Sequence, residues 1–307
     1  MGGNINQRIM KIAIVYHRID CDGLCSYAVL YKALIAKPSI YPNAVISGIG
    51  YNHGDALPDL SGYDIVYVAD IALPVDVMKS LNEEGRLIWI DHHVTSMEDA
   101  KANGYYLAPG IRTIGKGACE LCWEFMFASE PPLFVKYLSA YDVFDKKRFD
   151  FENEVLPFQY GVRNRLQLNP EAFVDALWKQ SSDFLDFLAE GRTILNYIRQ
   201  QGYRAAKNYG FTITLADKVP ALCILTDQSG SIPYQEAAKE AQCEVIVCVN
   251  RLDGKRYKVS CYATEGDTPI HLGDYLKDMY GGGGHANAAG AVIGAQDFRM
   301  LVEECIL

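Results

Sequence analysis

The chain has 307 residues, half of them hydrophobic, and a formal net charge of -9 at pH 7. This length suffices for a sizeable core and indicates two domains rather than one. The acidic balance argues against general binding of duplex nucleic acid, which needs a basic surface, but allows a short oligonucleotide held at a local site. No run of 18 or more apolar residues predicts a membrane-spanning helix, and the start, MGGNINQRIMK, lacks the apolar core of an export signal.

The chain contains nine cysteines. Without an export signal, we expect a cytoplasmic protein with free thiols rather than a disulfide framework. Cys119 and Cys122 form a single C-x-x-C, and no second pair completes the four ligands of a structural zinc site. The surrounding GKGACELCWEFMF predicts a helix, so we interpret both side chains as core residues.

Three strand–loop–helix units come first along the chain. The apolar run KIAIVYH (11–17) is followed by polar residues and then by a segment of helical composition, and DIVYVADIALP (64–74) and RLIWIDHH (86–93) repeat this plan. Continuous apolar runs that alternate with helices predict a parallel sheet covered by helices on both faces. Ligands of such sheets bind beyond the carboxyl ends of the strands, so polar residues at those ends are candidates for a site.

A helical pattern over about 170–208 precedes a second set of strands, with Gly191 and Gly202 as candidate breaks. FTITLA, PALCILT, CEVIVCVNRL and RYKVSCYAT predict the strands of a smaller domain. The predicted fold class is therefore α/β with two domains, an N-terminal parallel sheet and a smaller C-terminal mixed α/β domain joined by a helical connector. The predicted boundaries are 11–170 for the catalytic domain, 171–210 for the connector and 211–307 for the substrate-binding domain.

Acidic and imidazole side chains gather at the predicted strand ends. They are His17, Asp20 and Asp22 after the first strand, Asp70 after the second, Asp91, His92 and His93 after the third, and Asp142 in LSAYDVFD. Carboxylates crowded in this way repel one another unless cations compensate. Carboxylates mixed with imidazole suit Mn²⁺, whereas an all-oxygen site favours Mg²⁺ or Ca²⁺. Two ions about 3.5–4 Å apart form the common clamp for phosphoryl transfer and generate a hydroxide nucleophile.

These stretches resemble the motifs of the DHH-family phosphoesterases, which appear here in the family's order as HRIDCDG (17–23), VADIA (68–72), IDHHVT (90–95) and SAYDVFD (139–145). The stretch GGGGHANAAG (281–290) resembles the signature of the DHH-associated C-terminal domain. The resemblance implies a group that includes oligoribonucleases that also act on 3′-phosphoadenosine 5′-phosphate, cyclic-dinucleotide phosphodiesterases, single-strand exonucleases, and related pyrophosphatases and exopolyphosphatases.

The resemblance also implies a cofactor and roles for the strand-end residues. It implies two Mn²⁺ ions, with Mg²⁺ or Co²⁺ as alternatives. One ion would be bound by His17, Asp20 and Asp142, the other by Asp22 and His92, and both by Asp70. Asp91 would hydrogen-bond a histidine, and His93 would face the phosphate as a hydrogen-bond donor or acid.

The second domain is predicted to bind the substrate. Its glycine run lets the backbone approach a ligand closely and offers N–H groups to phosphate. The predicted substrate-binding residues are Gly282, Gly283, Gly284, His285, Arg256 and Lys258.

This sequence departs from the family pattern at two places. Many relatives have one more residue between the counterparts of His17 and Asp20, and Tyr262 stands where the family often has an arginine. Tyr262 either stacks on a base or packs in the core. In the fourth motif, Asp142 fits better than Asp145, which we interpret as a loop residue.

The leading functional prediction is hydrolysis of short oligonucleotides, linear or cyclic dinucleotides or nucleotide bisphosphates by two metal ions and a hydroxide. The alternatives are an exopolyphosphatase or pyrophosphatase, and a nucleotide-binding regulator with weak catalysis. The expected partner is a small phosphorylated molecule or a short single strand, without duplex or membrane binding. The resemblance adds a homodimer formed by the first domain as an option.

Overall fold

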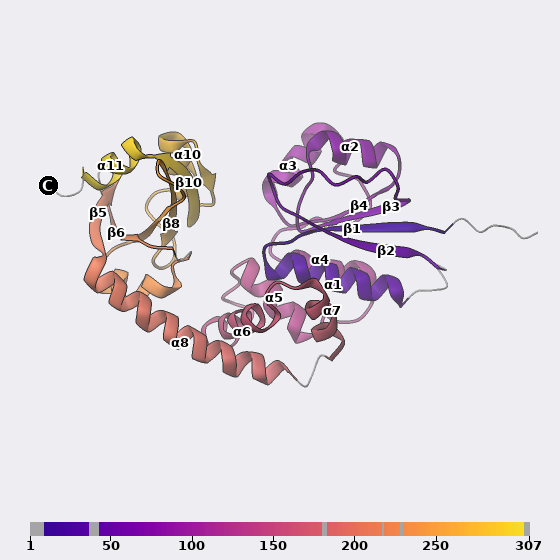
Figure 1. Ribbon diagram of the computed structural model, residues 1–307, viewed down its shortest axis with the longest axis horizontal. Coiled ribbons are helices and arrows are strands. Elements are labelled where there is room, and N and C mark those ends of the chain that lie inside the picture. Colours follow the sequence, from indigo (N-terminus) through magenta and orange to yellow (C-terminus); the bar gives the residue numbers. More distant parts are fainter. Residues whose placement is uncertain (1–8, 37–42, 180–182, 217, 228–229, 304–307) are drawn as a thin grey trace, which may run out of the picture. The chain divides into compact units, whose positions relative to one another are not determined.

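The computed structural model describes residues 9–36, 43–179, 183–216, 218–227 and 230–303, and it divides into two compact units, Met1–Ile194 and Leu195–Leu307 (Figure 1). The first unit contains the strands β1 (Lys11–His17), β2 (Val45–Tyr51), β3 (Ile65–Ala69) and β4 (Leu87–Ile90). Its helices are α1 (Cys21–Ile35), α2 (Val75–Glu83), α3 (Val94–Asn103), α4 (Ala118–Met126), α5 (Leu133–Asp142), η1 (Phe151–Val155), α6 (Leu156–Leu166), α7 (Pro170–Lys179) and the first part of α8 (Phe184–Tyr209).

The four strands of the first unit form one sheet in the order β2-β1-β3-β4, and all the pairs are parallel. Helices α2 and α3 cover one face of this sheet, and α1 and α4 cover the other (Figure 1). The predicted parallel sheet with helices on both faces is therefore confirmed. Its carboxyl ends bring the residues after β1, β3 and β4 to one edge.

Strand β2 was not predicted, because glycines weaken a strand pattern. Here they make room for aromatic packing. A Cβ atom at Gly48 would lie 2.5 Å from the Tyr27 ring, and one at Gly50 would lie 2.9 Å from Cβ of Arg18. Tyr27 in turn stacks on Tyr16 of β1 with ring centroids 4.8 Å apart.

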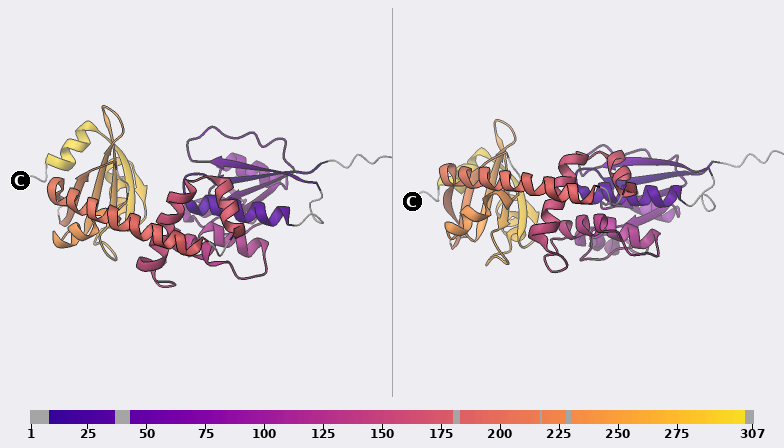
Figure 2. Two further views of the ribbon diagram at one scale, coloured as in Figure 1. Left: turned by 60° about the horizontal axis from the view of Figure 1, so that its bottom comes forward. Right: turned by 90° about the horizontal axis from the view of Figure 1, so that it is seen from below.

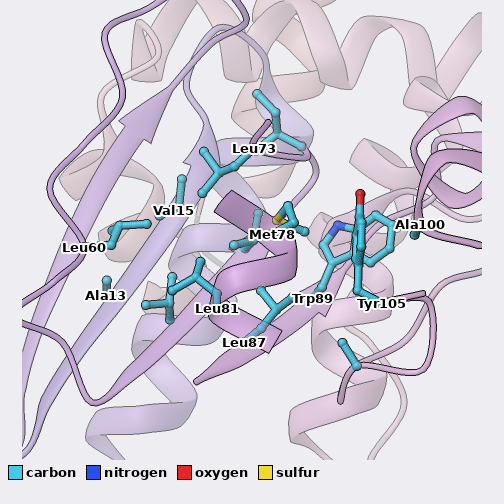
Figure 3. Close-up of a cluster of buried hydrophobic side chains, with 14 of the residues drawn as sticks. Ala13, Val15, Leu60, Leu73, Met78, Leu81, Leu87, Trp89, Ala100 and Tyr105 are labelled. Atoms are coloured by element: carbon cyan, nitrogen blue, oxygen red, sulfur yellow. The ribbon is translucent and has the colours of Figure 1, made fainter. Parts of the chain in front are cut away.

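The core between the sheet and helices α2 and α3 is built around Trp89 of β4 (Figure 3). Trp89 is fully buried and packs against Tyr105, with ring centroids 5.9 Å apart. Its indole Nε1 donates to Asp91 Oδ2 at 3.2 Å. The polar edge of a core side chain therefore holds the first residue beyond the strand.

The second unit contains β5 (Phe211–Leu215), β6 (Val219–Leu225), β7 (Val245–Arg251), β8 (Arg256–Ala263), β9 (Gly283–Gly284) and β10 (Ala288–Gly294), which form one sheet in the order β5-β6-β7-β8-β10-β9. Among these described strands, only the β6–β7 pair is parallel. One face packs on α10 (Leu272–Tyr280) and α11 (Ala295–Glu303). The other packs on the end of α8, η2 (Ile232–Tyr234) and α9 (Gln235–Glu240). The predicted fold class is confirmed.

Helix α8 runs without interruption through both candidate breaks (Figure 2). Gly191 and Gly202 serve close packing instead, because a Cβ atom at Gly191 would lie 1.7 Å from the Pro157 carbonyl oxygen and one at Gly202 would lie 2.3 Å from Cβ of Pro233. Cys119 and Cys122 are fully buried in α4, which confirms their interpretation as core residues. None of the helices within the described residues has the length and apolarity needed to cross a membrane.

Candidate functional site

The end of β1 and the start of α1 supply the first two polar side chains. Asp20 is the N-cap of α1 and accepts a hydrogen bond from the Gly23 amide at 2.9 Å. A Cβ atom at Gly23 would lie 2.0 Å from the carbonyl oxygen of His17, so only glycine allows α1 to begin this close to the strand. The tight turn places His17 Nδ1 2.5 Å from Asp20 Oδ2.

Asp70 follows β3 and lies between His17 and His92. Its Oδ2 is 3.5 Å from His17 Nδ1, and its Oδ1 is 3.2 Å from His92 Nε2. Its backbone is left-handed, with φ of +61°, a conformation in which aspartate and asparagine are the favoured residues after glycine. Asp70 is 2% exposed, and its Oδ2 accepts no hydrogen bond within the described residues.

Asp91 follows β4 and accepts hydrogen bonds from both of the histidines that come after it. Its Oδ1 accepts hydrogen bonds from the backbone amides of His92 at 2.7 Å and His93 at 3.1 Å. The same oxygen lies 2.7 Å from His93 Nδ1. Asp91 is fully buried, whereas the side chain of His93 is 41% exposed. The buried carboxylate therefore orients a histidine that faces outward.

Asp22 lies in the first turn of α1 and bonds to the start of another helix. Its Oδ2 accepts from the amide of Ala118 at 2.6 Å and its Oδ1 from that of Cys119 at 3.0 Å. These are the unpaired amides at the N-terminus of α4, where the helix dipole favours a negative charge. Asp22 is 1% exposed, and both of its carboxylate oxygens are held by backbone donors.

Asp142, the last residue of α5, completes the cluster. Its Oδ2 is 3.2 Å from His92 Nε2, and Asp22 Oδ2 is 3.8 Å from the same atom. The ligand atoms of His17, Asp20 and Asp70 lie within 4.8 Å of one another, and so do those of Asp22, His92 and Asp142. The structure therefore places Asp142 with Asp22 and His92 rather than with His17 and Asp20.

Burial and mutual repulsion set the protonation of the cluster. Burial and the charge of Asp22 raise the pKa of Asp70 well above its usual range, and the same two causes raise the pKa of Asp142. Burial by itself lowers the pKa of His17, but the adjacent carboxylates of Asp20 and Asp70 outweigh it and raise the pKa to about 10. The cluster therefore retains protons at neutral pH unless other cations replace them.

A second network, which the sequence did not reveal, joins α4 to α5. Ser139 Oγ accepts from the Gly117 amide at 2.8 Å and donates to Glu120 Oε2 at 2.7 Å. The Arg148 guanidinium donates to both oxygens of Glu120 at 2.8 Å. Glu120 is 1% exposed, so these contacts, rather than water, satisfy its charge. The network fixes the N-terminus of α4, which holds Asp22, to the helix that ends at Asp142.

Asp145, the other aspartate of the fourth motif, lies outside this cluster. Asp145 Oδ1 accepts from the amides of Lys147 and Arg148 within its own loop, at 3.0 and 3.2 Å. This local turn matches the interpretation of Asp145 as a loop residue.

The predicted substrate-binding residues belong to the second unit. Gly283 and Gly284 form β9, paired to Gly290 and Ala289. A Cβ atom at Gly282 would lie 2.4 Å from the Gly290 carbonyl oxygen, so this glycine is required by packing. The side chains of the three polar candidates are exposed, and they are His285, Arg256 and Lys258.

Two further side chains of the second unit bear on substrate binding. Arg256 pairs with Asp253 at 2.7 Å. Tyr262 packs against the core cluster that includes Ile246 and Cys248, which favours the packing interpretation over base stacking.

The donor set of the cluster suits divalent cations. Carboxylates and imidazoles from α1, β1, β3, β4 and α5 converge, and the buried Asp70 Oδ2 has an unused lone pair. A mixed carboxylate–imidazole set with excess negative charge is typical of Mn²⁺ and similar ions. The residues present therefore fit the predicted class of cofactor.

We expect divalent metal to raise the thermal unfolding midpoint and to release protons on binding. Protons held by Asp70 and Asp142 at their raised pKa values must leave, so the affinity for metal falls as pH is lowered. Titration calorimetry with Mn²⁺ in two buffers of different ionisation enthalpy measures the protons released. Asp145→Asn, outside the cluster, should leave the count unchanged. Equal heats in both buffers would contradict the expectation.

Comparisons with known proteins show which family and which folds this chain resembles. Residues 11–150 match the family model described as DHH family, N-terminal domain. The pGpG-specific phosphodiesterase PggH from Vibrio cholerae has a similar structure, with a TM-score of 0.55 and 14% identity over 96% of this chain and 97% of that one. The DHH domain of a protein described as a member of a family of ribosomal proteins gives a TM-score of 0.59 and 15% identity over 96% of this chain and 85% of that one.

No curated protein matches the chain in sequence. At the identities found, the two solved structures show a shared fold. The family match covers all four motifs at the strand ends and in α5, and it confirms the predicted class of enzyme, a hydrolase of phosphoester bonds. Residues 11–150 carry the N-terminal domain of the DHH family.

Proposed function

We propose that the protein uses two divalent ions, Mn²⁺ foremost, to hydrolyse short oligonucleotides, linear or cyclic dinucleotides, or nucleotide bisphosphates. The observation that carries the proposal is the pair of ligand groups around Asp70, one with His17 and the other with His92. Such paired groups are the arrangement of two-metal phosphoryl-transfer sites.

We assign the ligands by the observed geometry. His17, Asp20 and Asp70 form one ligand set, and Asp22, His92 and Asp142 form the other. Asp70 contacts His17 through one oxygen and His92 through the other, which supports its role as the ligand common to both sets.

When bound, the ions supply a nucleophile at neutral pH and offset charge on the phosphate. His93 holds a proton for the leaving oxygen. Because its Nδ1 bonds to Asp91, its Nε2 is the atom left to face a substrate. Asp91 fixes the ring orientation through both side-chain and backbone contacts.

The region 211–307 is proposed as the substrate-binding domain, after the connector 171–210 and the catalytic domain 11–170. The exposed side chains of His285, Arg256 and Lys258 and the glycines 282–284 are its proposed contacts to the substrate. Arg256 already has an acidic partner in Asp253, so Lys258 is the more available cation.

The test is a product assay with Mn²⁺ on a panel of pGpG, pApA, cyclic di-AMP, 3′-phosphoadenosine 5′-phosphate and tripolyphosphate. The pGpG-specific phosphodiesterase of similar fold makes the linear dinucleotide pGpG the first substrate to test. We expect a nucleotide to be cleaved by the wild type and not by Asp70→Asn. Cleavage of tripolyphosphate alone would favour a polyphosphatase, and metal-independent binding of dinucleotides without product would favour a regulator.

A further inference from the structure

A small cavity lies beside the acidic cluster in the first unit, and the function proposed above leaves it unassigned. Its volume is about 70 Å³. It is lined by three carboxylates of the cluster, by three side chains able to donate hydrogen bonds, and by apolar neighbours: Asp20, Asp22 and Asp142; Tyr141, Gln159 and Arg163; and Cys21, Leu138 and Leu168.

Arg163 is the cation of this cavity and has no acidic partner. It forms no ion pair with any residue of the described part of the chain, although three carboxylates line the same cavity. Arg165 on the same helix differs, because it pairs with Glu190 at 3.0 Å and with Asp186 at 3.5 Å. Arg163 is an exposed residue, and its guanidinium is available to another group as well as to water.

Gln159 lies one helical turn before Arg163 on α6, so the two side chains share a face. Gln159 is 6% exposed, and its side-chain oxygen has no hydrogen-bond partner among the described residues. Burial of an unsatisfied amide costs free energy. A buried side-chain oxygen without a partner at the wall of a cavity indicates a polar occupant.

The size and charge of the cavity define that occupant. About 70 Å³ is several times the roughly 10–15 Å³ that one water needs and far below the roughly 300 Å³ of a pocket for a drug-sized ligand. A single phosphoryl group fits this range, and a nucleobase does not. Arg163 disfavours a further cation, while the carboxylates disfavour an anion until divalent ions neutralise them.

We propose that Arg163 and Gln159, with Tyr141, form a pocket for the oxygens of one phosphoryl group, which is occupied only when divalent metal is bound to the cluster. The guanidinium would pair with non-bridging phosphate oxygens, as arginine does in charge-assisted contacts, and the amide of Gln159, rotated about its last torsion, would donate to a third oxygen. The inference rests on the proposed function for the cations at the carboxylates. It adds substrate contacts on α6 of the first unit to those proposed in the second.

Binding of inorganic phosphate, measured by titration calorimetry, tests the proposal without turnover. The wild type should bind phosphate in the presence of Mn²⁺ and should lose this binding with a chelator. Arg163→Gln should weaken binding about 10–100-fold, the effect of removing a hydrogen-bonded charge partner. Gln159→Met, which preserves volume, should weaken it by roughly threefold to tenfold.

Arg165→Gln is the matched control, because it removes the same charge from the same helix away from the cavity. It should leave phosphate affinity within about twofold, since its surface ion pairs contribute little. Unchanged phosphate affinity in Arg163→Gln, equal effects of Arg163→Gln and Arg165→Gln, or no phosphate binding by the metal-loaded wild type would each overturn the pocket.

The outcome separates this inference from the proposed function. Metal-dependent phosphate binding that Arg163→Gln weakens would support the pocket even if no nucleotide in the panel is cleaved. If the wild type cleaves a nucleotide but Arg163→Gln binds phosphate as tightly as the wild type, the proposed function stands and the pocket is excluded.

Discussion

Asp70→Asn should abolish turnover while making the metal-free protein more stable. Asparagine tolerates the left-handed backbone at this position, which alanine would strain, so the fold is preserved. The neutral amide removes one charge from the contacts to both ligand groups, and we expect activity to fall on the order of a thousandfold or more. Removing a buried carboxylate whose pKa is raised by burial and by Asp22 should add about 1–2 kcal/mol to the free energy of unfolding at neutral pH.

The stability difference between Asp70→Asn and the wild type should depend on pH in one direction. A carboxyl with a raised pKa in the folded state costs no stability below its unfolded pKa, and the cost grows as pH rises from the unfolded value to the folded value. The advantage of Asp70→Asn should therefore be present at pH 7 and shrink towards pH 4, as measured by urea unfolding with a chelator present. With Mn²⁺, the order should reverse, because only the wild type gains fully from the ion. A pH-independent difference would count against the electrostatic explanation.

Arg148→Met should destabilise the protein by about 2–3 kcal/mol and weaken metal binding about tenfold. The change leaves the carboxylate of Glu120, which is 1% exposed, with Ser139 as its remaining side-chain partner. The estimate lies below the cost of breaking a fully buried pair because the side chain of Arg148 is 32% exposed. The metal effect follows because the network that connects α5 to the N-terminus of α4, which holds Asp22, loses the guanidinium that neutralises Glu120.

A double-mutant cycle and a surface control make this prediction specific. Glu120→Gln combined with Arg148→Met removes both charges and should recover much of the loss. Lys136→Met breaks the pair of Lys136 with Glu130, whose side chain is 87% exposed, and should cost less than about 1 kcal/mol without changing metal affinity. Equal effects of Arg148→Met and Lys136→Met would show that the network has no role at the site.

The sequence predicted the parts of the site that depend on local pattern. Each apolar run ends in polar residues, and parallel strands align their carboxyl ends, so the convergence of His17, Asp70 and His92 could be anticipated from the motifs. The fold class followed from the same alternation of strands and helices.

Contacts between distant helices could not be anticipated in this way. Nothing in the local pattern of α4 shows that its first amides bind Asp22, 96 residues earlier. The position of Asp142 beside His92 depends on where α5 packs, which the motif spacing does not fix. Gly48 and Gly50 concealed β2 because their role is to admit Tyr27 and Arg18, a packing requirement without a signature in the strand itself.

The parallel pairing of β1 with both β2 and β3 has a consequence for synthesis on the ribosome. Strand β1 lies between β2 and β3 and is synthesised first, but both of its neighbours come later in the chain. The last cluster residue, Asp142, follows most of the first unit in the chain. A nascent chain therefore cannot assemble the complete acidic cluster before α5 has left the exit tunnel, so metal binding to the full ligand set comes late in the synthesis of the first unit.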